Sequence, residues 1–262
     1  MSDFISALII AVVQGLTEWL PVSSSGHLVL FGKILDYSGA GMMFDVALHF
    51  GTLMAVFVYF GKDIIDIVED LLKWRTRSPN FKLGILLVVA SIPAGIVGIL
   101  FEKYFEAAFG SLGVAAMGFA VTGIFLIIAS LDFGSLRQKT EGLGYGKALL
   151  IGCAQAVAII PGVSRSGATI SAGLLSGLNE KDAIKFSFLL SIPAIFGANL
   201  VVIGNQALPR ELIWATFVSF IVGIAGIHMM LKILANSRKN LRYFAAYCLL
   251  LALAIGIYLI AW

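Results

Sequence analysis

Six apolar segments, each close to bilayer length, constrain the fold of this chain more than any other feature. They cover residues 41–61, 82–101, 112–131, 183–204, 212–233 and 241–261. A transmembrane α-helix needs about 20 consecutive apolar residues. Its backbone must satisfy its own hydrogen bonds, because the bilayer core holds no water. The sequence therefore predicts an all-α polytopic membrane protein with six full transmembrane helices and the lipid bilayer as its surroundings.

The composition indicates a single membrane domain over residues 1–262. The chain is 60% hydrophobic and 13% charged, whereas soluble domains carry about 25% charged residues. Its net charge of +3 predicts no nucleic-acid partner, because the basic residues lie in loops between the apolar segments. Cys153 and Cys248 lie inside apolar segments and show no disulfide or metal-binding spacing.

Four shorter apolar pieces are too short to cross a bilayer comfortably. They cover residues 4–20, 24–36, 144–160 and 164–177. They occur as two pairs, and each pair is joined by a cluster of Pro, Gly and Ser. We expect two re-entrant helix-loop-helix hairpins. Non-helical backbone at membrane depth is tolerated only where protein or a water-filled cavity surrounds it, so the two breaks are candidate binding sites.

The position of the hairpins along the chain predicts their relative orientation. Three full spans separate them, and an odd number of crossings makes the hairpins enter the membrane from opposite faces. The halves 1–131 and 132–262 are therefore expected to form an inverted-topology repeat, with both breaks near the bilayer midplane.

The basic residues predict which face is cytoplasmic. Most of the 18 Lys and Arg residues fall in segments expected on one face, namely 62–82, 137–147, 181–185 and 232–242. The opposite face holds only Lys33, Lys103 and Arg210. The positive-inside rule puts the first face in the cytoplasm and both termini outside. Segment 62–80 is the longest charged loop, and it is either a helix at the level of the lipid headgroups or a solvated loop.

The two breaks have related sequences. The first runs from Gln14 to His27 and the second from Gln155 to Thr169. When Gln14 is aligned with Gln155, the matches continue with Val22 on Val163, Ser23 on Ser164, Ser25 on Ser166 and Gly26 on Gly167. In each, an apolar helix runs into Pro and a group of hydroxyl side chains before a new helix begins. Such broken helices commonly form the binding site of membrane proteins.

Glu18 is the first candidate functional residue. A carboxylate inside an apolar segment is energetically costly and marks a functional site by default. Gln14 lies four residues earlier, on the same face of the helix. Glu18 could bind a divalent cation or act as a general base. The competing interpretation is a carboxylate that accepts hydrogen bonds from Ser or Thr and holds the bend.

Arg165 is the basic residue of the second break. Its guanidinium offers a fork of donors that suits phosphate oxygens. The helix that begins beside it presents free N–H groups to an anion, with Ser164, Ser166, Gly167 and Thr169 as further candidate contacts. The first break repeats this arrangement from Pro21 to Gly26. The competing interpretation is a structural ion pair between Arg165 and Glu18.

His27 and the serine run before it complete the candidate site. His27 could be a nucleophile, a general acid for a leaving oxygen, or a residue that orients a serine. Among Ser23, Ser24 and Ser25, one could be a nucleophile or phosphate ligand while the others cap the helix. His49 and His228 lie on apolar spans, and we interpret them as packing or headgroup residues, with Asp45 as a local partner for His49.

The quoted residues carry a specific resemblance. Three segments closely resemble the undecaprenyl-diphosphate phosphatase family, also called the bacitracin-resistance protein family: Gln14-Gly-Leu-Thr-Glu18, Pro21-Val-Ser-Ser-Ser-Gly-His27 and Pro161-Gly-Val-Ser-Arg-Ser-Gly-Ala-Thr169. The resemblance implies a hydrolase of the bacterial inner membrane that converts undecaprenyl diphosphate to undecaprenyl phosphate. This reaction recycles the lipid carrier of peptidoglycan synthesis and confers bacitracin resistance. A divalent cation, Mg²⁺ or Ca²⁺, is implied as cofactor.

The same resemblance assigns roles to residues. The acidic position of the family maps to Glu18, the serine to Ser24, the histidine to His27 and the arginine to Arg165. The family carries Glu or Gln at the position of Gln14. This chain has Gln there, so Glu18 alone takes the acidic role and is the candidate metal ligand. The nucleophile stays open between Ser24, His27 and water.

A transporter or flippase of the polyprenyl phosphate carrier is the alternative function. Inverted repeats with broken helices at the midplane are the transporter pattern, and the fold alone does not decide between the two classes. The combination of Glu18, Ser24, His27 and Arg165 favours the phosphatase, because a carrier needs no acid–base and hydroxyl set beside its phosphate-binding arginine. The sequence leaves the oligomeric state open, with a homodimer as one candidate.

Overall fold

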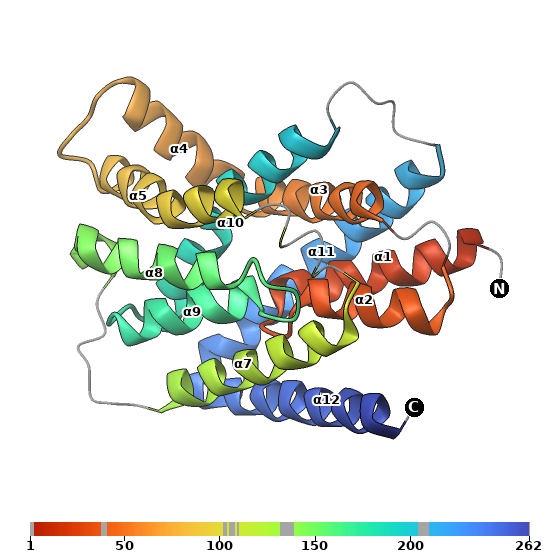
Figure 1. The fold of residues 1–262 in the computed structure, drawn as a ribbon. Coiled ribbons are helices and arrows are strands. Elements are labelled where there is room, and N and C mark those ends of the chain that lie inside the picture. Colours follow the sequence, from red (N-terminus) through yellow and green to blue (C-terminus); the bar gives the residue numbers. More distant parts are fainter. Residues whose placement is uncertain are drawn as a thin grey trace.

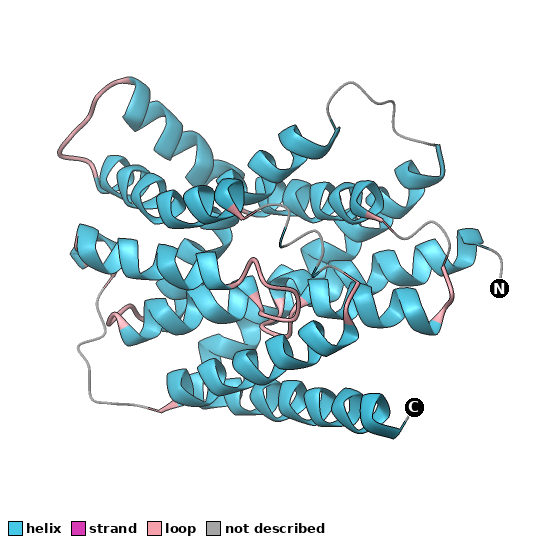
Figure 2. Cartoon of the chain, in the orientation of Figure 1, coloured by secondary structure: helices cyan, strands magenta, loops and turns pink. Residues whose placement is uncertain are grey.

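The computed structural model describes residues 3–37, 41–101, 104, 108, 110–131, 139–203 and 210–261. These residues form helices joined by short loops, and no β-strand occurs among them (Figure 2). The predicted all-helical architecture is therefore confirmed.

Four helices are long and apolar enough to cross a membrane, which confirms a multi-pass membrane protein. The first two are α5 (Pro79–Leu100) and α7 (Leu112–Ser130). The other two lie near the C-terminus, in α11 (Arg210–Asn236) and α12 (Leu241–Ala261). The other two expected spans, 41–61 and 183–204, fall on α3 (Met42–Tyr59) and α10 (Glu180–Ile203). Neither is among these four, and α3 is apolar and long enough only together with the helix that follows it.

The four short pieces form two helical hairpins. The first consists of α1 (Asp3–Trp19) and α2 (Ser24–Ile34), and the second of α8 (Tyr145–Val157) and α9 (Arg165–Leu175). The hairpins approach each other from opposite ends of the molecule, and their loops meet at its centre (Figures 1 and 2). There the Ser166 hydroxyl donates to the Leu20 carbonyl at 3.0 Å, which joins the two loops directly.

Local sequence signals explain why both hairpins break where they do. In the first hairpin, Ser23 caps α2, because its hydroxyl oxygen accepts the Gly26 N–H at 3.3 Å. In the second, Ser164 caps α9 by accepting the Gly167 N–H at 3.0 Å. Side-chain oxygens at these positions satisfy N–H groups that a new helix leaves free. The two matched serines of the sequence therefore perform the same local task.

Gly162 allows the second loop to lie against α7. Its φ of 89° is in the left-handed region, which glycine adopts without steric cost. A Cβ atom at this position would lie 2.2 Å from the Ala115 carbonyl oxygen of α7. The neighbouring loop backbone is fixed as well, since the Thr122 hydroxyl donates to the Gly162 carbonyl at 3.0 Å. Any larger residue would push the second loop away from its helix.

The interior is packed around Trp19, the last residue of α1. Its side chain is fully buried and meets the ring of Phe188 from α10, with 4.8 Å between ring centroids. Gly15, one turn earlier, lies so close to α11 that a Cβ would meet Val222 at 2.7 Å. These contacts fix the end of α1 in the protein core, directly before the first break.

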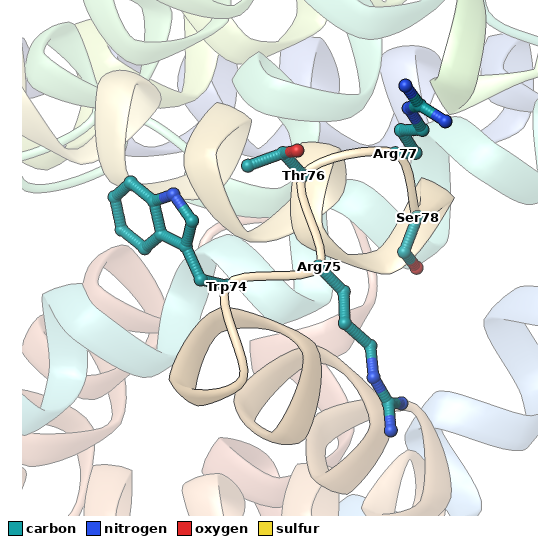
Figure 3. A pocket seen from close by; sticks show the side chains of 5 residues that line it. All are labelled: Trp74, Arg75, Thr76, Arg77 and Ser78. Atoms are coloured by element: carbon teal, nitrogen blue, oxygen red, sulfur yellow. The ribbon is translucent and has the colours of Figure 1, made fainter.

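A bend of 80° separates α3 from α4 (Gly61–Leu72). The segment that the sequence left as a surface helix or a loop is therefore helical through Leu72. The chain then turns through Trp74–Ser78 into α5, and this turn lines a surface depression at one end of the molecule (Figures 1 and 3). Two short 3-10 helices, η1 (Thr140–Gly142) and η2 (Arg238–Asn240), complete the described secondary structure.

Candidate functional site

Glu18 lies at the centre of the contact between the two hairpins. Its side chain is 5% exposed. Its Oε2 accepts hydrogen bonds from the Gln14 amide at 2.9 Å and from the Ser24 hydroxyl at 2.6 Å. Its Oε1 accepts a hydrogen bond from Nη2 of Arg165 at 2.6 Å. The two structural contacts that the sequence offered as competing interpretations are therefore both present. The carboxylate forms the ion pair with Arg165, and it also accepts a hydrogen bond from a hydroxyl of the first break.

Arg165 connects three helices. Besides the ion pair with Glu18 of α1, its Nη1 donates to the Ser187 carbonyl of α10 at 3.3 Å. Its guanidinium carbon lies 5.2 Å from the centre of the Trp19 ring, within the range of a cation–π contact. The guanidinium is thereby fixed, and Arg165 is itself the first residue of α9.

The three serines of the first break separate into distinct roles. Ser24 alone places its hydroxyl on Glu18, whereas Ser23 caps α2. Ser25 accepts the Gly162 N–H at 3.4 Å and lies 3.3 Å from Ser23, oxygen to oxygen. Ser24 is thus the hydroxyl placed for proton transfer to a carboxylate, while Ser25 joins the two loops.

The hydroxyls of the second break are held by the protein itself. Ser164 caps α9 and lies 3.2 Å from Ser166, oxygen to oxygen. Thr169 donates to the Arg165 carbonyl at 2.8 Å and lies 2.6 Å from the Ser187 hydroxyl. Gly26 and Gly167 sit at the two helix starts, where Gly26 lets the ring of Phe119 approach. These residues shape the loops around Glu18 and Arg165.

His49 joins the site, contrary to our interpretation of it as a packing or headgroup residue. Its Nε2 lies 3.4 Å from Oε2 of Glu18, and its Nδ1 lies 2.7 Å from the Asp45 carbonyl oxygen. Both ring nitrogens face oxygen acceptors, one on the backbone of α3 and one on Glu18. The sequence held one signal for this: Asp45, His49 and Thr52 recur at the spacing of a single helix face.

His27 faces away from this cluster. Its Nδ1 lies 2.7 Å from the Ser23 carbonyl oxygen and its Nε2 lies 2.7 Å from the Tyr247 hydroxyl of α12. The imidazole stacks on the Tyr247 ring and meets Phe119 of α7 edge-on. Because a carbonyl only accepts, Nδ1 carries hydrogen, and in the neutral ring Nε2 accepts from Tyr247. None of these contacts reaches Glu18, Ser24 or Arg165.

Comparison with known proteins identifies the family. A sequence model described as "Bacitracin resistance protein BacA" matches residues 7–254, a range that includes both breaks. This chain belongs to the bacitracin resistance protein family. The resemblance drawn from the two motifs is thus confirmed.

Relatives in this family match along nearly the whole chain. An undecaprenyl-diphosphatase of Rubrobacter xylanophilus is 39% identical over 98% of both chains. One from Halothermothrix orenii is 40% identical over 97% of both, and one from Thermosipho melanesiensis is 40% identical over 94% of this chain and 96% of its own. The match extends over both hairpins and the spans between them.

The cluster of this BacA family member does not by itself form a metal site. The side chains that contact the Glu18 carboxylate all present hydrogen-bond donors, and they are Gln14, Ser24, Arg165 and His49. Arg165 and His49 can also carry positive charge. Among the described residues, no group of three or more His, Cys, Asp or Glu side chains could hold a metal ion. Mg²⁺ is commonly bound by one or two carboxylates together with substrate phosphates. Glu18 therefore fits a cation only if a substrate supplies the other oxygens.

Proposed function

We propose that this protein hydrolyses undecaprenyl diphosphate to undecaprenyl phosphate and inorganic phosphate. The reaction recycles the lipid carrier of bacterial cell-wall synthesis and confers bacitracin resistance. The observation that carries this proposal is the contact of Ser24, Glu18 and Arg165 where two broken helices meet. The names of the relatives, all undecaprenyl-diphosphatases, support the substrate.

In this proposal Arg165 and the two helix starts bind the diphosphate. Guanidinium and phosphate form charge-assisted hydrogen bonds, and helix N-termini favour anions. The ion pair with Glu18 keeps the buried guanidinium compensated until a diphosphate arrives. Arg165 can then shift part of its hydrogen bonding to the phosphate oxygens, which frees the Glu18 carboxylate to accept a proton.

The chemical step begins at the Ser24 hydroxyl or at a water molecule in its place. The attacking oxygen forms a bond to the terminal phosphorus, and its proton passes to Glu18. The bond from that phosphorus to the bridging oxygen breaks, and undecaprenyl phosphate leaves. With Ser24 as nucleophile, water then releases the phosphate from the serine. Positioned proton transfer of this kind contributes about 10²–10⁴-fold to rate.

His27 takes the orienting role among the three that the sequence left open. Its contact with the Ser23 carbonyl fixes the backbone directly before Ser24. Tyr247 and Phe119 hold the imidazole on the other side. We therefore assign His27 to the positioning of the first loop.

The proposed cofactor is a divalent cation, Mg²⁺ or Ca²⁺, bound mainly by oxygens of the diphosphate. Glu18 would hold it through Oε1, the oxygen that Arg165 releases, so that Oε2 remains available for the proton from Ser24. Such a cation would neutralise charge on the phosphates. Gln14 contacts Oε2 of Glu18 through its neutral amide, so it supplies no second negative charge for the cation. The cation is thus proposed to enter with the substrate.

For the membrane arrangement we propose six spans, two re-entrant hairpins and an inverted repeat of halves 1–131 and 132–262. The opposed approach of the hairpins and the distribution of basic residues support this proposal. Both termini and the entrance to the site would face the outer side of the inner membrane, with the prenyl chain in a lipid-facing groove.

A transporter of the polyprenyl phosphate carrier is the second candidate, because two opposed broken helices are the transporter pattern. Phosphate release from undecaprenyl diphosphate by the purified protein in detergent with Mg²⁺ separates the two functions. We expect release by the wild type and by Glu69→Gln, an exposed carboxylate on α4, and little release by Glu18→Gln or Arg165→Ala. Lipid binding without any release by the wild type would support the transporter instead.

A further inference from the structure

The helix α4 exposes an apolar stripe that no described part of the protein covers. Ile65 is 64% exposed, Val68 48% and Leu72 82%. Their spacing places them on one face of the helix. Trp74, just beyond the end of the helix, is 74% exposed and continues the stripe. The following turn, with its basic side chains, lies at the same end of the α4–α5 hairpin (Figures 1 and 3).

The rest of α4 is divided between a packed face and a charged face. Ile67 and Leu71 contact the backbone of α5 at Gly84. The charged residues lie on the arc opposite the apolar residues as a whole, and this arc borders the stripe at Glu69, next to Ile65. On it Asp63 accepts from Lys185 of α10 at 2.6 Å and Glu69 from Lys73 at 2.6 Å. The apolar arc of α4 is thus wider than the surface of α5 that covers it.

This pattern is that of a helix lying along a membrane surface. Five of its twelve residues are charged: Lys62, Asp63, Asp66, Glu69 and Asp70. A helix that crosses the hydrocarbon core would have to bury these charges at high cost. A helix with one strongly polar and one apolar face instead lies in the interface, with the apolar face in the boundary of headgroups and acyl chains. The 80° bend after α3 gives α4 a different direction from the preceding helix.

The turn after α4 presents groups suited to a lipid headgroup. Figure 3 shows Trp74 projecting from one side of the turn and Arg77 from another. Arg75 is held by the protein through Asp70, at 3.0 Å. The Ser78 hydroxyl and the Arg75 guanidinium lower the pKa of the Asp70 carboxyl, so that pair stays ionised. Arg77 is exposed, and no described residue pairs with it.

We propose that α4 is a membrane-surface helix whose stripe of Ile65, Val68 and Leu72 lies in the acyl-chain boundary, that Trp74 lies at the same interface, and that Arg77 binds the headgroup of an anionic phospholipid. Trp is enriched at membrane interfaces, and basic residues next to a membrane attract anionic lipids. The guanidinium of Arg77 matches a phosphate group in geometry and charge. The site lies outside the Glu18 cluster, so this inference does not rest on the phosphatase reaction.

The first test measures where the stripe lies. Val68→Cys and Asp66→Cys, each in a Cys153→Ser background, are spin-labelled in lipid nanodiscs, while the native Cys248 is buried. Two collision rates of the spin label are compared. One is its collision rate with oxygen, which concentrates in lipid, and the other is its collision rate with a water-soluble nickel chelate. We expect oxygen to dominate at position 68 and the chelate at position 66. Dominance of the chelate at position 68 would overturn the proposal, and so would protection of that label from both, which would mean that protein covers the stripe.

The second test measures headgroup selectivity. Brominated phosphatidylglycerol and brominated phosphatidylcholine are compared as quenchers of Trp74 fluorescence, isolated as the difference from Trp74→Phe. We expect stronger quenching by the anionic lipid and an approximately fivefold smaller preference in Arg77→Gln, the loss expected from about 1 kcal/mol per basic residue near a membrane. Lys62→Gln, an exposed basic residue at the other end of α4, is the matched control. Equal quenching of the wild type by both lipids would overturn the headgroup site.

Discussion

Nη2 of Arg165 lies 2.6 Å from Oε1 of Glu18, and this ion pair joins residues that are 147 positions apart in the chain. It links the two broken helices directly, beside the hydrogen bonds from Ser166 to Leu20 and from Gly162 to Ser25. Both side chains are largely buried, so each charge depends on the other for compensation. The pair thus fixes the relative position of the two loops as well as the charges that a diphosphate would meet.

Removing one member of this pair should cost more than removing both. An uncompensated buried charge destabilises a protein by about 3–5 kcal/mol. We expect Glu18→Gln and Arg165→Gln each to lower the thermal unfolding midpoint in detergent, and the double variant to recover part of the loss. The coupling should be about 0.5–3 kcal/mol. Strictly additive effects would show that the two charges do not compensate each other.

Ser24 and Ser23 should respond differently to substitution. Ser24→Ala removes the hydroxyl on Glu18, and we expect phosphate release to fall by about 10²-fold or more with little change in unfolding. Ser23→Ala removes a helix cap and should cost about 1 kcal/mol of stability while retaining more activity. Parallel measurement of turnover and unfolding midpoint separates the two roles. Equal turnover losses in both variants would contradict the assignment of Ser24.

Tyr247 should affect the reaction through His27. Tyr247→Phe keeps the stacked ring and removes the hydroxyl that contacts Nε2 of His27. A hydrogen bond of this kind is worth about 0.5–1.5 kcal/mol. We expect kcat to fall by up to about tenfold with KM unchanged, because the residue acts on the loop that carries Ser24. His27→Ala should cost more, since it also frees the Ser23 carbonyl. An unchanged kcat in Tyr247→Phe would show that the contact has no part in turnover.

We expect the residue at position 14 to determine whether the protein binds a cation before its substrate. We expect the purified wild type to show no tight Mn²⁺ site by electron paramagnetic resonance, and to bind the ion when methylene diphosphonate is added. Gln14→Glu places a second carboxylate where the amide nitrogen now lies 2.9 Å from Oε2 of Glu18. This variant should bind Mn²⁺ without the diphosphonate. Tight binding by the wild type alone, lost in Glu18→Gln, would contradict a cation that enters with the substrate.

The sequence by itself determined the all-helical, multi-pass character of the protein and the two breaks. Apolar length indicated membrane spans, and Pro, Gly and the capping serines indicated where α1 and α8 end and where α2 and α9 begin. These signals are local, because helix formation and capping depend on residues within a few positions of each other. The residue types at the breaks also indicated Glu18, Ser24 and Arg165 as candidates, since buried charge is costly wherever the chain folds.

Only the tertiary structure decided which side chains face one another. His49 reaches Glu18 because α3 packs beside α1, and His27 turns to Tyr247 because α12 covers the first hairpin on its other side. The different partners of the serines likewise depend on tertiary contacts. Ser24 donates to Glu18, whereas Ser25 accepts from Gly162 because the second loop approaches it. Helix packing sets these rotations through contacts between residues distant in sequence. The local pattern of Asp45, His49 and Thr52 marked a polar face of α3 but did not show that this face meets Glu18.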